Sequence, residues 1–232
     1  MRYEEFKALR LRVLQPEGVE RFGIDAILLA DFASRRLHKS DRLLDLGTGS
    51  GIVALLLLAR GISYAAGVEI YPPAAEAARE NARINSLPLE VFSGDLREEL
   101  PFPEKSFDLA VANPPFFPAG SESPLPGRTL ARSDRTCSFR DVTRAASRRL
   151  KNGGRFYAVY RPERLTDALC AMREEGIEPK RLRPAAHDAG KAPFLILIEG
   201  KKGAKPGLIF DPLLTLDGDE MREICAVRHF AM

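Results

Sequence analysis

Short apolar runs alternate with longer helical stretches through most of this chain. Residues 42–47 (RLLDLG) form a short apolar run that ends in glycine, and the GIVALLLLAR that follows is apolar on every side, which predicts a buried strand leading into a buried helix. The same pairing recurs downstream. We expect further strands at residues 64–70, 89–95, 107–115 and 153–160, and helices at residues 72–87, 139–150 and 162–175. Strands that alternate with helices predict a parallel sheet with helices on both faces.

The last pair of expected strands differs from the others. Residues 179–187 and 192–199 are joined by DAGKA alone, which is too short for a helical crossover, so we expect antiparallel neighbours. The expected fold class is therefore α/β, with a doubly wound, mostly parallel seven-stranded sheet and an antiparallel last strand.

A helix is expected ahead of the first of these strands, in the sequence AILLADFASRR after Asp25. Ile27, Leu28 and Phe32 fall on one face of this helix, and Asp25 is well placed as its N-cap. We expect this helix to open the fold.

One long irregular segment, residues 115–136, is rich in proline, glycine and serine, and such loops are usually functional or disordered. We expect a mobile substrate loop there.

Composition narrows the class of protein. With 232 residues, of which 45% are hydrophobic and 29% charged, the chain has enough apolar side chains for one sizeable core. It has no long apolar run, and the opening MRYEEFKALRLRV lacks the order of a secretory signal, so we expect no membrane segment and a cytoplasmic location. Cysteine and histidine are scattered, which indicates neither a disulfide framework nor a metal site. These residues are Cys137, Cys170, Cys225, His38, His187 and His229.

The formal net charge of +3 is too small to prove a nucleic-acid partner, but the charges are unevenly distributed. Acids outnumber bases in residues 41–120, whereas basic residues gather in the later half of the chain. They are Arg128, Arg132, Arg135, Arg140, Arg144, Arg148, Arg149, Lys151, Arg155, Lys180, Arg181, Arg183, Lys191, Lys201, Lys202 and Lys205. A phosphate-facing surface accounts for this arrangement. Solvated helix faces and edge-strand lysines account for it equally well.

The turn after the first strand of the alternation is a candidate ligand site, because ligands of open α/β sheets lie at the carboxyl ends of the strands. This turn has the sequence Asp45-Leu46-Gly47-Thr48-Gly49-Ser50-Gly51. Its three glycines permit positive φ and leave bare backbone beside a ligand, and the next helix offers N–H groups to a carboxylate. Ile52 stands where the dinucleotide fingerprint has glycine, which disfavours NAD and FAD. Tight packing alone is the alternative explanation.

Acidic residues end three adjacent strands of the expected sheet, namely Asp45, Glu69 and Asp95. Glu69 can accept hydrogen bonds from both hydroxyls of a ribose. Together these acids suit a ligand with a ribose, an amino group and a cationic centre, and they would repel a pyrophosphate. Roles as cap or turn residues are the alternative, and it is weakest for Glu69.

A second candidate site follows the fourth strand of the alternation. Pro114 and Pro115 stiffen the backbone after Asn113, so that the Asn113 side-chain oxygen and the Pro114 carbonyl can accept hydrogen bonds from one NH2 group. Conjugated amines are poor nucleophiles because their lone pair is delocalised. Two such hydrogen bonds localise the lone pair and align it with an electrophile. Phe116 and Phe117 can stack on a flipped base, although a rigid strand exit with two core phenylalanines is the alternative.

These motifs resemble class I S-adenosylmethionine-dependent methyltransferases of the amino-methylating NPP[FYW] group. More narrowly, the chain resembles the bacterial tRNA (adenine-N6)-methyltransferases that modify the adenine next to the anticodon of a valine tRNA. The likeness spans nearly the whole chain and rests on RFGIDAILLADF (21–32), LLDLGTGSGIVALLLLAR (43–60), GVEI (67–70), ARENARINSL (78–87), GDLRE (94–98), FDLAVANPPFF (107–117), LKNGGRFYAVYRPERL and KPGLIF. Phe116 stands where tyrosine is frequent, and residues 131–134 are less like the family's usual loop, which leaves the RNA target open.

The resemblance implies S-adenosylmethionine as the cofactor and RNA, with tRNA expected, as the partner. We expect no metal and no membrane, and the oligomeric state stays open with a monomer as the default. The implied cofactor-binding residues are Asp45, Gly47, Thr48, Gly49, Gly51, Glu69, Ile70, Asp95, Leu96 and Asn113. The implied catalytic residues are Asn113, Pro114, Pro115 and Phe116. Residues 1–35 would form an N-terminal extension and lid helix, and residues 36–232 a Rossmann-like methyltransferase domain as one compact unit.

The expected reaction is transfer of a methyl group from S-adenosylmethionine to N6 of an adenine in tRNA. Guanine N2 of ribosomal RNA and a protein glutamine present the same NH2 geometry, so both remain open as acceptors. A noncatalytic RNA-binding module on the same fold is an alternative of another class. The intact Asn113, Glu69 and glycine turn argue against it.

Overall fold

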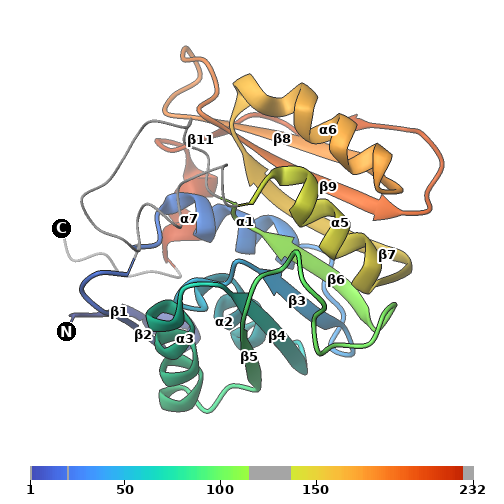
Figure 1. The fold of residues 1–232 in the computed structure, drawn as a ribbon. Helices are drawn as coiled ribbons and strands as arrows, with labels where there is room; N and C mark the ends of the chain where they lie inside the picture. The colour runs from blue at the N-terminus through green and yellow to red at the C-terminus, as the bar shows by residue number, and fades with distance from the viewer. Residues whose placement is uncertain (1, 20, 115–136, 227–232) are drawn as a thin grey trace.

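A large sheet with helices on both faces forms the body of the protein (Figure 1). The structure is a computed structural model, and it describes residues 2–19, 21–114 and 137–226. Seven strands make up most of the sheet: β3 (Arg42–Leu46), β4 (Tyr64–Glu69), β5 (Leu89–Ser93), β6 (Phe107–Ala112), β7 (Leu150–Tyr160), β8 (Ile177–Ala186) and β9 (Leu195–Lys202). They lie in the order β8-β9-β7-β6-β3-β4-β5, in which β9 is antiparallel to both neighbours and the others pair in parallel. The expected doubly wound α/β fold is confirmed.

The sheet is wider than the seven strands that the sequence predicts. Two further strands, β10 (Ile209–Phe210) and β11 (Leu214–Thr215), pair in parallel with β8, so the sheet in the described residues has nine strands. Each of them is two residues long. Such short segments carry no periodic pattern, which explains why the expected number was wrong.

Alternate residues of the strands face two separate cores. Leu43 belongs to a core that contains α1 (Ile24–Ser34) and α2 (Ile52–Ala59), whereas Leu44 belongs to a core that contains α5 (Phe139–Arg149) and α6 (Leu165–Glu174). Two more helices, α3 (Pro72–Ile84) and α7 (Asp219–Ala226), contribute to the first core. The sheet is thus a middle layer between two layers of helices (Figure 1).

A β-hairpin, and not a helix, opens the fold. Strands β1 (Arg2–Phe6) and β2 (Leu11–Gln15) pair antiparallel on either side of a short 3-10 turn, η1 (Lys7–Leu9). The buried Asn81 of α3 holds this hairpin, because it accepts from Leu14 N–H at 2.6 Å and donates to Leu14 O at 3.0 Å. Its Nδ2 also donates to Ser50 O at 2.9 Å, which links the hairpin to the glycine turn. The sequence does not predict this hairpin, because the contacts that hold it join residues far apart in the chain.

Several element boundaries differ from the expected ones. Helix α1 has Gly23 as its N-cap, so the expectation that Asp25 caps this helix was wrong; Asp25 lies in the first turn. The expected helix at residues 162–175 is divided into a 3-10 turn, η2 (Pro162–Arg164), and α6. Strand β7 begins at Leu150, three residues before the expected start. The first three residues of β7 precede Gly153 and Gly154, and these glycines interrupt the apolar pattern of the strand.

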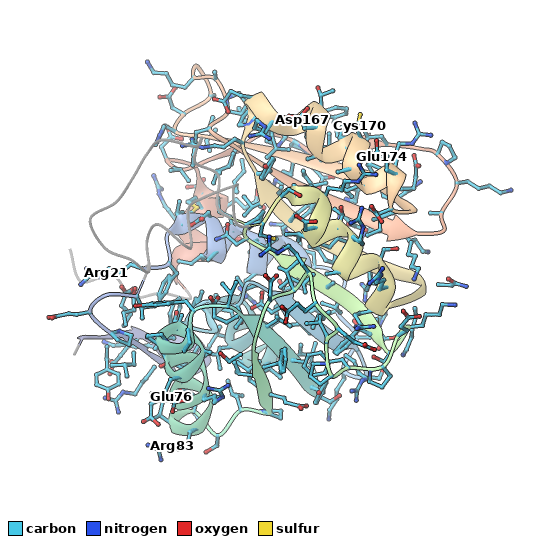
Figure 2. All side chains as sticks on the ribbon, viewed as in Figure 1. Arg21, Glu76, Arg83, Asp167, Cys170 and Glu174 are labelled. Carbon is cyan, nitrogen blue, oxygen red and sulfur yellow. The ribbon has the colours of Figure 1, made fainter. Side chains whose placement is uncertain are left out.

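Cys137 is half-buried, and Cys170 is a free thiol exposed on α6 (Figure 2). No group of three or more potential metal-ligating side chains occurs in the part of the chain that the structure describes. None of the helices described has the length and apolar character that crossing a membrane requires.

Candidate active site

Four neighbouring parallel strands end at the same edge of the sheet. In the register of the sheet, Leu46 of β3 lies opposite Val68 of β4 and Ala112 of β6, and Glu69 lies opposite Ser93 of β5. The segments that follow these strands therefore lie side by side, and they contain the candidate residues of the sequence.

The glycine turn after β3 has an open side. Gly47, Gly49 and Gly51 have positive φ angles of 76°, 57° and 87°. The N–H groups of Gly47 and Thr48 donate to Val68 O at 2.9 and 3.0 Å, which anchors the turn on β4. A Cβ at Gly47 or Gly49 would meet no heavy atom within 4 Å, apart from chain neighbours, in the described structure. A ligand can therefore approach the bare backbone here.

Asp45 points into the protein and supports the turn from below. Its carboxylate accepts a hydrogen bond from Thr48 Oγ1 at 2.7 Å, and both side chains are buried. Burial raises the pKa of Asp45 to about 7. A Cβ at Gly67 would lie 2.8 Å from Thr48 Cγ2, so only glycine at this position of β4 lets Thr48 pack under the turn. Asp45 is thus buried beneath the turn. It does not lie exposed beside Glu69 and Asp95, as the sequence predicts.

Glu69 holds two backbone segments at the edge. Its Oε2 accepts from Gly49 N–H at 2.8 Å, and its Oε1 accepts from Tyr71 N–H at 2.8 Å. Burial raises the pKa of Glu69, and the backbone hydrogen bonds oppose this effect. Ile70, the next residue, is 41% exposed and forms an apolar surface beside this carboxylate.

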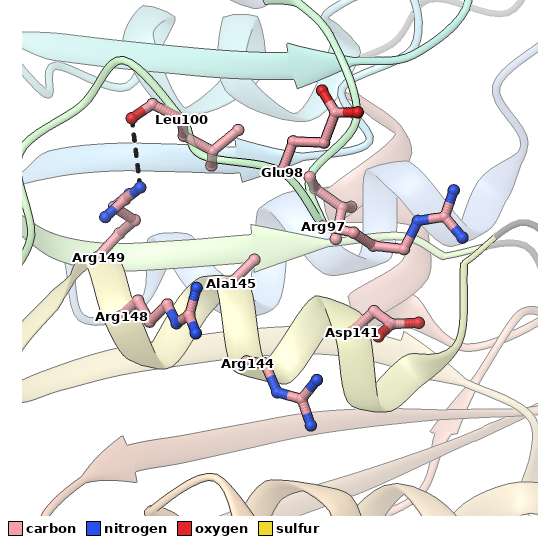
Figure 3. Close-up of a pocket in the computed structure, with 9 residues that line it drawn as sticks. Arg97, Glu98, Leu100, Asp141, Arg144, Ala145, Arg148 and Arg149 are labelled. Carbon is pink, nitrogen blue, oxygen red and sulfur yellow. Dashed lines mark hydrogen bonds between the residues drawn. The ribbon is translucent and has the colours of Figure 1, made fainter.

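Asp95 is engaged by its neighbour. It accepts from the backbone N–H of Arg97 at 2.9 Å and from the Arg97 guanidinium, and these hydrogen bonds hold the pKa of Asp95 below its usual range. Leu96 is partly buried and lines a cavity of about 50 Å³ between the segment after β5 and α5 (Figure 3). Arg148 of α5 lines the same cavity.

Asn113 makes the most specific contact of the site. Its Nδ2 donates to Asp25 Oδ2 at 2.8 Å, which joins the segment after β6 to the first turn of α1. Its Oδ1 is buried and has no hydrogen-bond partner in the described structure. Buried oxygens are rarely left without a donor, so this one is available to a ligand that brings an N–H group. Pro114 is buried beside it.

Other candidates for the acceptor site lie outside the described residues. They are Pro115, Phe116, Phe117 and the loop at residues 115–136, together with Arg128, Arg132 and Arg135. The sequence therefore remains the only basis for their roles.

Several basic residues of the later half make ion pairs within the protein. Arg140 and Arg144 of α5 bind Glu175 at 3.4 and 3.1 Å and thereby tie α5 to α6. Arg155 binds Asp41 at 2.6 Å. Further pairs are Lys151 with Asp108, Arg181 with Glu199 and Asp211, and Arg183 with Glu220. These side chains have structural partners, so any phosphate-facing set is smaller than the sequence suggests.

Sequence reasoning missed three residues that shape the site. The sequence indicates only a cap role for Asp25 and no role for Gly67 or Asn81 individually. Each of them acts through a partner far away in the chain: Asn113, Thr48 and Leu14, respectively. The signals in the sequence are three motifs that carry the resemblance: RFGIDAILLADF contains Asp25, GVEI contains Gly67 and ARENARINSL contains Asn81.

Comparison with known proteins agrees with this architecture. The family model described as "Methyltransferase small domain" matches residues 23–174. A tRNA1(Val) (adenine(37)-N6)-methyltransferase of Parabacteroides distasonis is 30% identical over 199 residues, which cover 85% of this chain and 82% of the relative. A protein of the same name from Porphyromonas gingivalis strain W83 is 34% identical over 200 residues, which cover 75% of this chain and 78% of the relative.

Solved structures of methyltransferases share the fold. A predicted O-methyltransferase from Agrobacterium tumefaciens has a TM-score of 0.69 at 21% identity, over 88% of this chain and 96% of that protein. Geranyl diphosphate methyltransferase in complex with SAM has a TM-score of 0.57 at 16% identity, over 76% of this chain and 85% of that protein. The chain belongs to the methyltransferase small domain family, and it is an S-adenosylmethionine-dependent methyltransferase.

Proposed function

We propose that this protein transfers a methyl group from S-adenosylmethionine to N6 of an adenine in tRNA. The observation that carries this proposal is the buried Asn113 Oδ1, which has no partner in the described structure. An exocyclic NH2 group supplies the donor that this oxygen lacks. Relatives at about a third identity, named as tRNA1(Val) (adenine(37)-N6)-methyltransferases, support adenine in tRNA as the acceptor.

The edge of the sheet fits the cofactor. When bound, S-adenosylmethionine supplies an electrophilic methyl group on a sulfonium. The open backbone at Gly47 and Gly49 would accommodate its amino-acid part, and Glu69 would accept from the ribose hydroxyls. Asp45 and Thr48 would act from beneath by keeping the turn in this conformation. Gly51 would begin the helix that follows the turn.

The adenine ring of the cofactor would lie between the apolar side chains of Ile70 and Leu96. These two residues directly follow Glu69 and Asp95 in the sequence. Asp95 would accept from its amino group. The Arg97 guanidinium already engages this carboxylate, but two carboxylate oxygens have lone pairs for more than one donor. Asp95 can therefore serve both partners.

The acceptor adenine would be held by the segment after β6. Asn113 Oδ1 and the Pro114 carbonyl would accept from its N6 amino group and localise the nitrogen lone pair toward the methyl group. Pro115 would keep this backbone stiff, and Phe116 would stack on the flipped base. No strong base is needed before the transfer, because the amine loses its proton only after it has gained the methyl group.

The RNA would lie along α5. Arg148 is exposed there, and its guanidinium makes no ion pair with any described residue, unlike those of Arg140 and Arg144. Within the N-terminal extension at residues 1–35, the segment before Asp25 would act as a lid beside the cofactor, and residues 36–232 would form one compact domain. A cytoplasmic location and a monomer complete this proposal.

Nucleoside analysis tests the proposed function. We expect N6-methyladenosine after the protein is incubated with S-adenosylmethionine and tRNA that lacks the modification, followed by digestion and mass spectrometry. The variant Asn113→Ala should bind the cofactor as the wild type does in equilibrium dialysis but lose turnover by orders of magnitude. N2-methylguanosine in ribosomal RNA or methylglutamine in protein would identify another acceptor. Absence of cofactor binding would favour a noncatalytic RNA-binding module.

A further inference from the structure

The hydrogen bond between Asp25 and Asn113 controls which end of the amide faces α1. The two residues are 88 positions apart in the chain, and the Asn113 Nδ2 donates to Asp25 Oδ2 at 2.8 Å. An ionised carboxylate has acceptors only, so it tolerates the NH2 end of the amide and repels the oxygen end. Asp25 therefore turns the Asn113 Oδ1 away from α1.

The orientation of this amide matters because the two ends have opposite hydrogen-bonding character. In the observed orientation Oδ1 is buried and lacks a donor, so it can accept from an amino group. In the reversed orientation the Asn113 NH2 would face the NH2 of the substrate, and two sets of donors would meet. Only the first orientation can draw electron density toward the acceptor nitrogen.

The surroundings of Asp25 hold the carboxylate in place. A Cβ at Gly23 would lie 2.6 Å from Asp25 Oδ1, so glycine leaves the room that this carboxylate occupies. Asp25 also lies in the first turn of α1, where the helix dipole stabilises a negative charge. The next residues, Ala26 and Ile27, are buried in the core, which makes α1 a rigid support.

We propose that Asp25 is a positioning residue for methyl transfer, which keeps the Asn113 amide oriented with Oδ1 toward the acceptor amine. This proposal rests on the proposed function, because it requires an NH2 group as the acceptor. Asp25 itself contacts neither the amine nor the methyl group in this role. It acts through Asn113 alone.

A double-mutant cycle separates this role from others. We expect Asp25→Ala to lower kcat on tRNA about tenfold to a hundredfold, as for loss of a hydrogen bond to a charged group, and to leave the Kd for S-adenosylmethionine unchanged. In the Asn113→Ala background the same change should have no further effect, because the side chain to be oriented is gone. Additive losses in the cycle would overturn the proposal. A Kd for the cofactor that weakens in parallel with kcat would assign Asp25 to cofactor binding instead.

Two variants control for general damage to α1. Asp31→Asn removes another carboxylate of the same helix, which binds Arg35 and Arg60, and should retain wild-type kcat at a temperature below its Tm. Asp25→Asn keeps the shape of the side chain but offers donors as well as an acceptor, so it should lower kcat less than Asp25→Ala does. Equal turnover of Asp25→Asn and the wild type would show that a charged acceptor is not required.

A spectroscopic measurement tests the orientation independently of activity. The side-chain amide signals of Asn113, assigned as those missing in Asn113→Asp, should shift in the 15N-labelled Asp25→Ala variant and not in Asp31→Asn. Unchanged signals in Asp25→Ala would overturn the proposal. If the wild type methylates no tRNA, the proposed function fails, whereas the NMR result still decides whether Asp25 orients this amide.

Discussion

Glu69 accepts a hydrogen bond from the backbone N–H of Gly49 at 2.8 Å, which joins the end of β4 to the turn after β3. The other oxygen of the same carboxylate accepts from Tyr71 N–H at 2.8 Å. One side chain thus fixes two backbone segments that border the proposed cofactor site. The same carboxylate retains lone pairs for the ribose hydroxyls, because each of its oxygens can accept more than one hydrogen bond.

Replacement of Glu69 by glutamine should therefore weaken cofactor binding. A glutamine side chain can accept from only one of the two backbone N–H groups, and its NH2 would oppose the other. We expect a Kd for S-adenosylmethionine about tenfold higher or more, measured by calorimetry. The matched control is Glu90→Gln on β5, whose carboxylate binds Tyr64 Oη at 2.5 Å, and it should leave this Kd unchanged. Equal Kd values for Glu69→Gln and the wild type would remove Glu69 from the cofactor site.

Burial of Asp45 predicts a pH dependence of stability. Its pKa is raised from 3.8 to about 7, so the folded state binds this proton more tightly than the unfolded state does. The free energy of unfolding should then decrease as pH rises from about 4 to about 7, by at most about 4 kcal/mol, and the contribution should be level above that pH.

Urea unfolding of the wild type and Asp45→Asn at pH 5 and pH 7.5 measures this contribution. The variant keeps an oxygen acceptor for Thr48 Oγ1 but has no titrating group, so its advantage over the wild type should grow with pH. If the difference in free energy of unfolding is the same at both pH values, Asp45 does not titrate in this range.

The sequence predicts the central strands and helices of the fold because their signals are local. The apolar run at residues 42–47 and the uniformly apolar helix after it match β3 and α2 closely. The antiparallel pairing of β9 with β8 follows from a short connection. The hairpin β1–β2 depends instead on Asn81, 67 residues from Leu14, and no local pattern contains this information.

The candidate site shows the same division between local and distant information. The glycine turn and the acids at the strand ends are visible as motifs, because each follows a recognisable strand. The inward role of Asp45 was not visible, since it depends on burial and on Thr48. The partner of Asn113 was not visible either, because α1 reaches the segment after β6 only in the folded chain.

The contact between Gly67 and Thr48 should be necessary for the conformation of the turn. A methyl group at position 67 would lie 2.8 Å from Thr48 Cγ2 and 3.0 Å from its Oγ1, in a buried site without room to adjust. We expect Gly67→Ala to lower the Tm by several degrees and to weaken S-adenosylmethionine binding, as overpacking by about 1–3 kcal/mol does. Adding Thr48→Ser removes the nearer atom and should restore part of both losses. A Gly67→Ala protein with wild-type Tm and Kd would show that the turn tolerates the displacement.

Arg148 should contribute to RNA binding through charge alone. It is exposed on α5, lines the cavity beside Leu96, and has no ion-pair partner among the described residues. If it contacts one phosphate, Arg148→Ala should weaken tRNA binding and lower the slope of log K against log salt by about 0.7–0.9. Arg173→Ala is the matched control, because Arg173 is likewise a surface arginine of a helix, α6, but pairs with Glu178 of β8 at 3.3 Å. An equal salt slope for Arg148→Ala and the wild type would mean that the RNA does not pass over this part of α5, even if tRNA is the substrate.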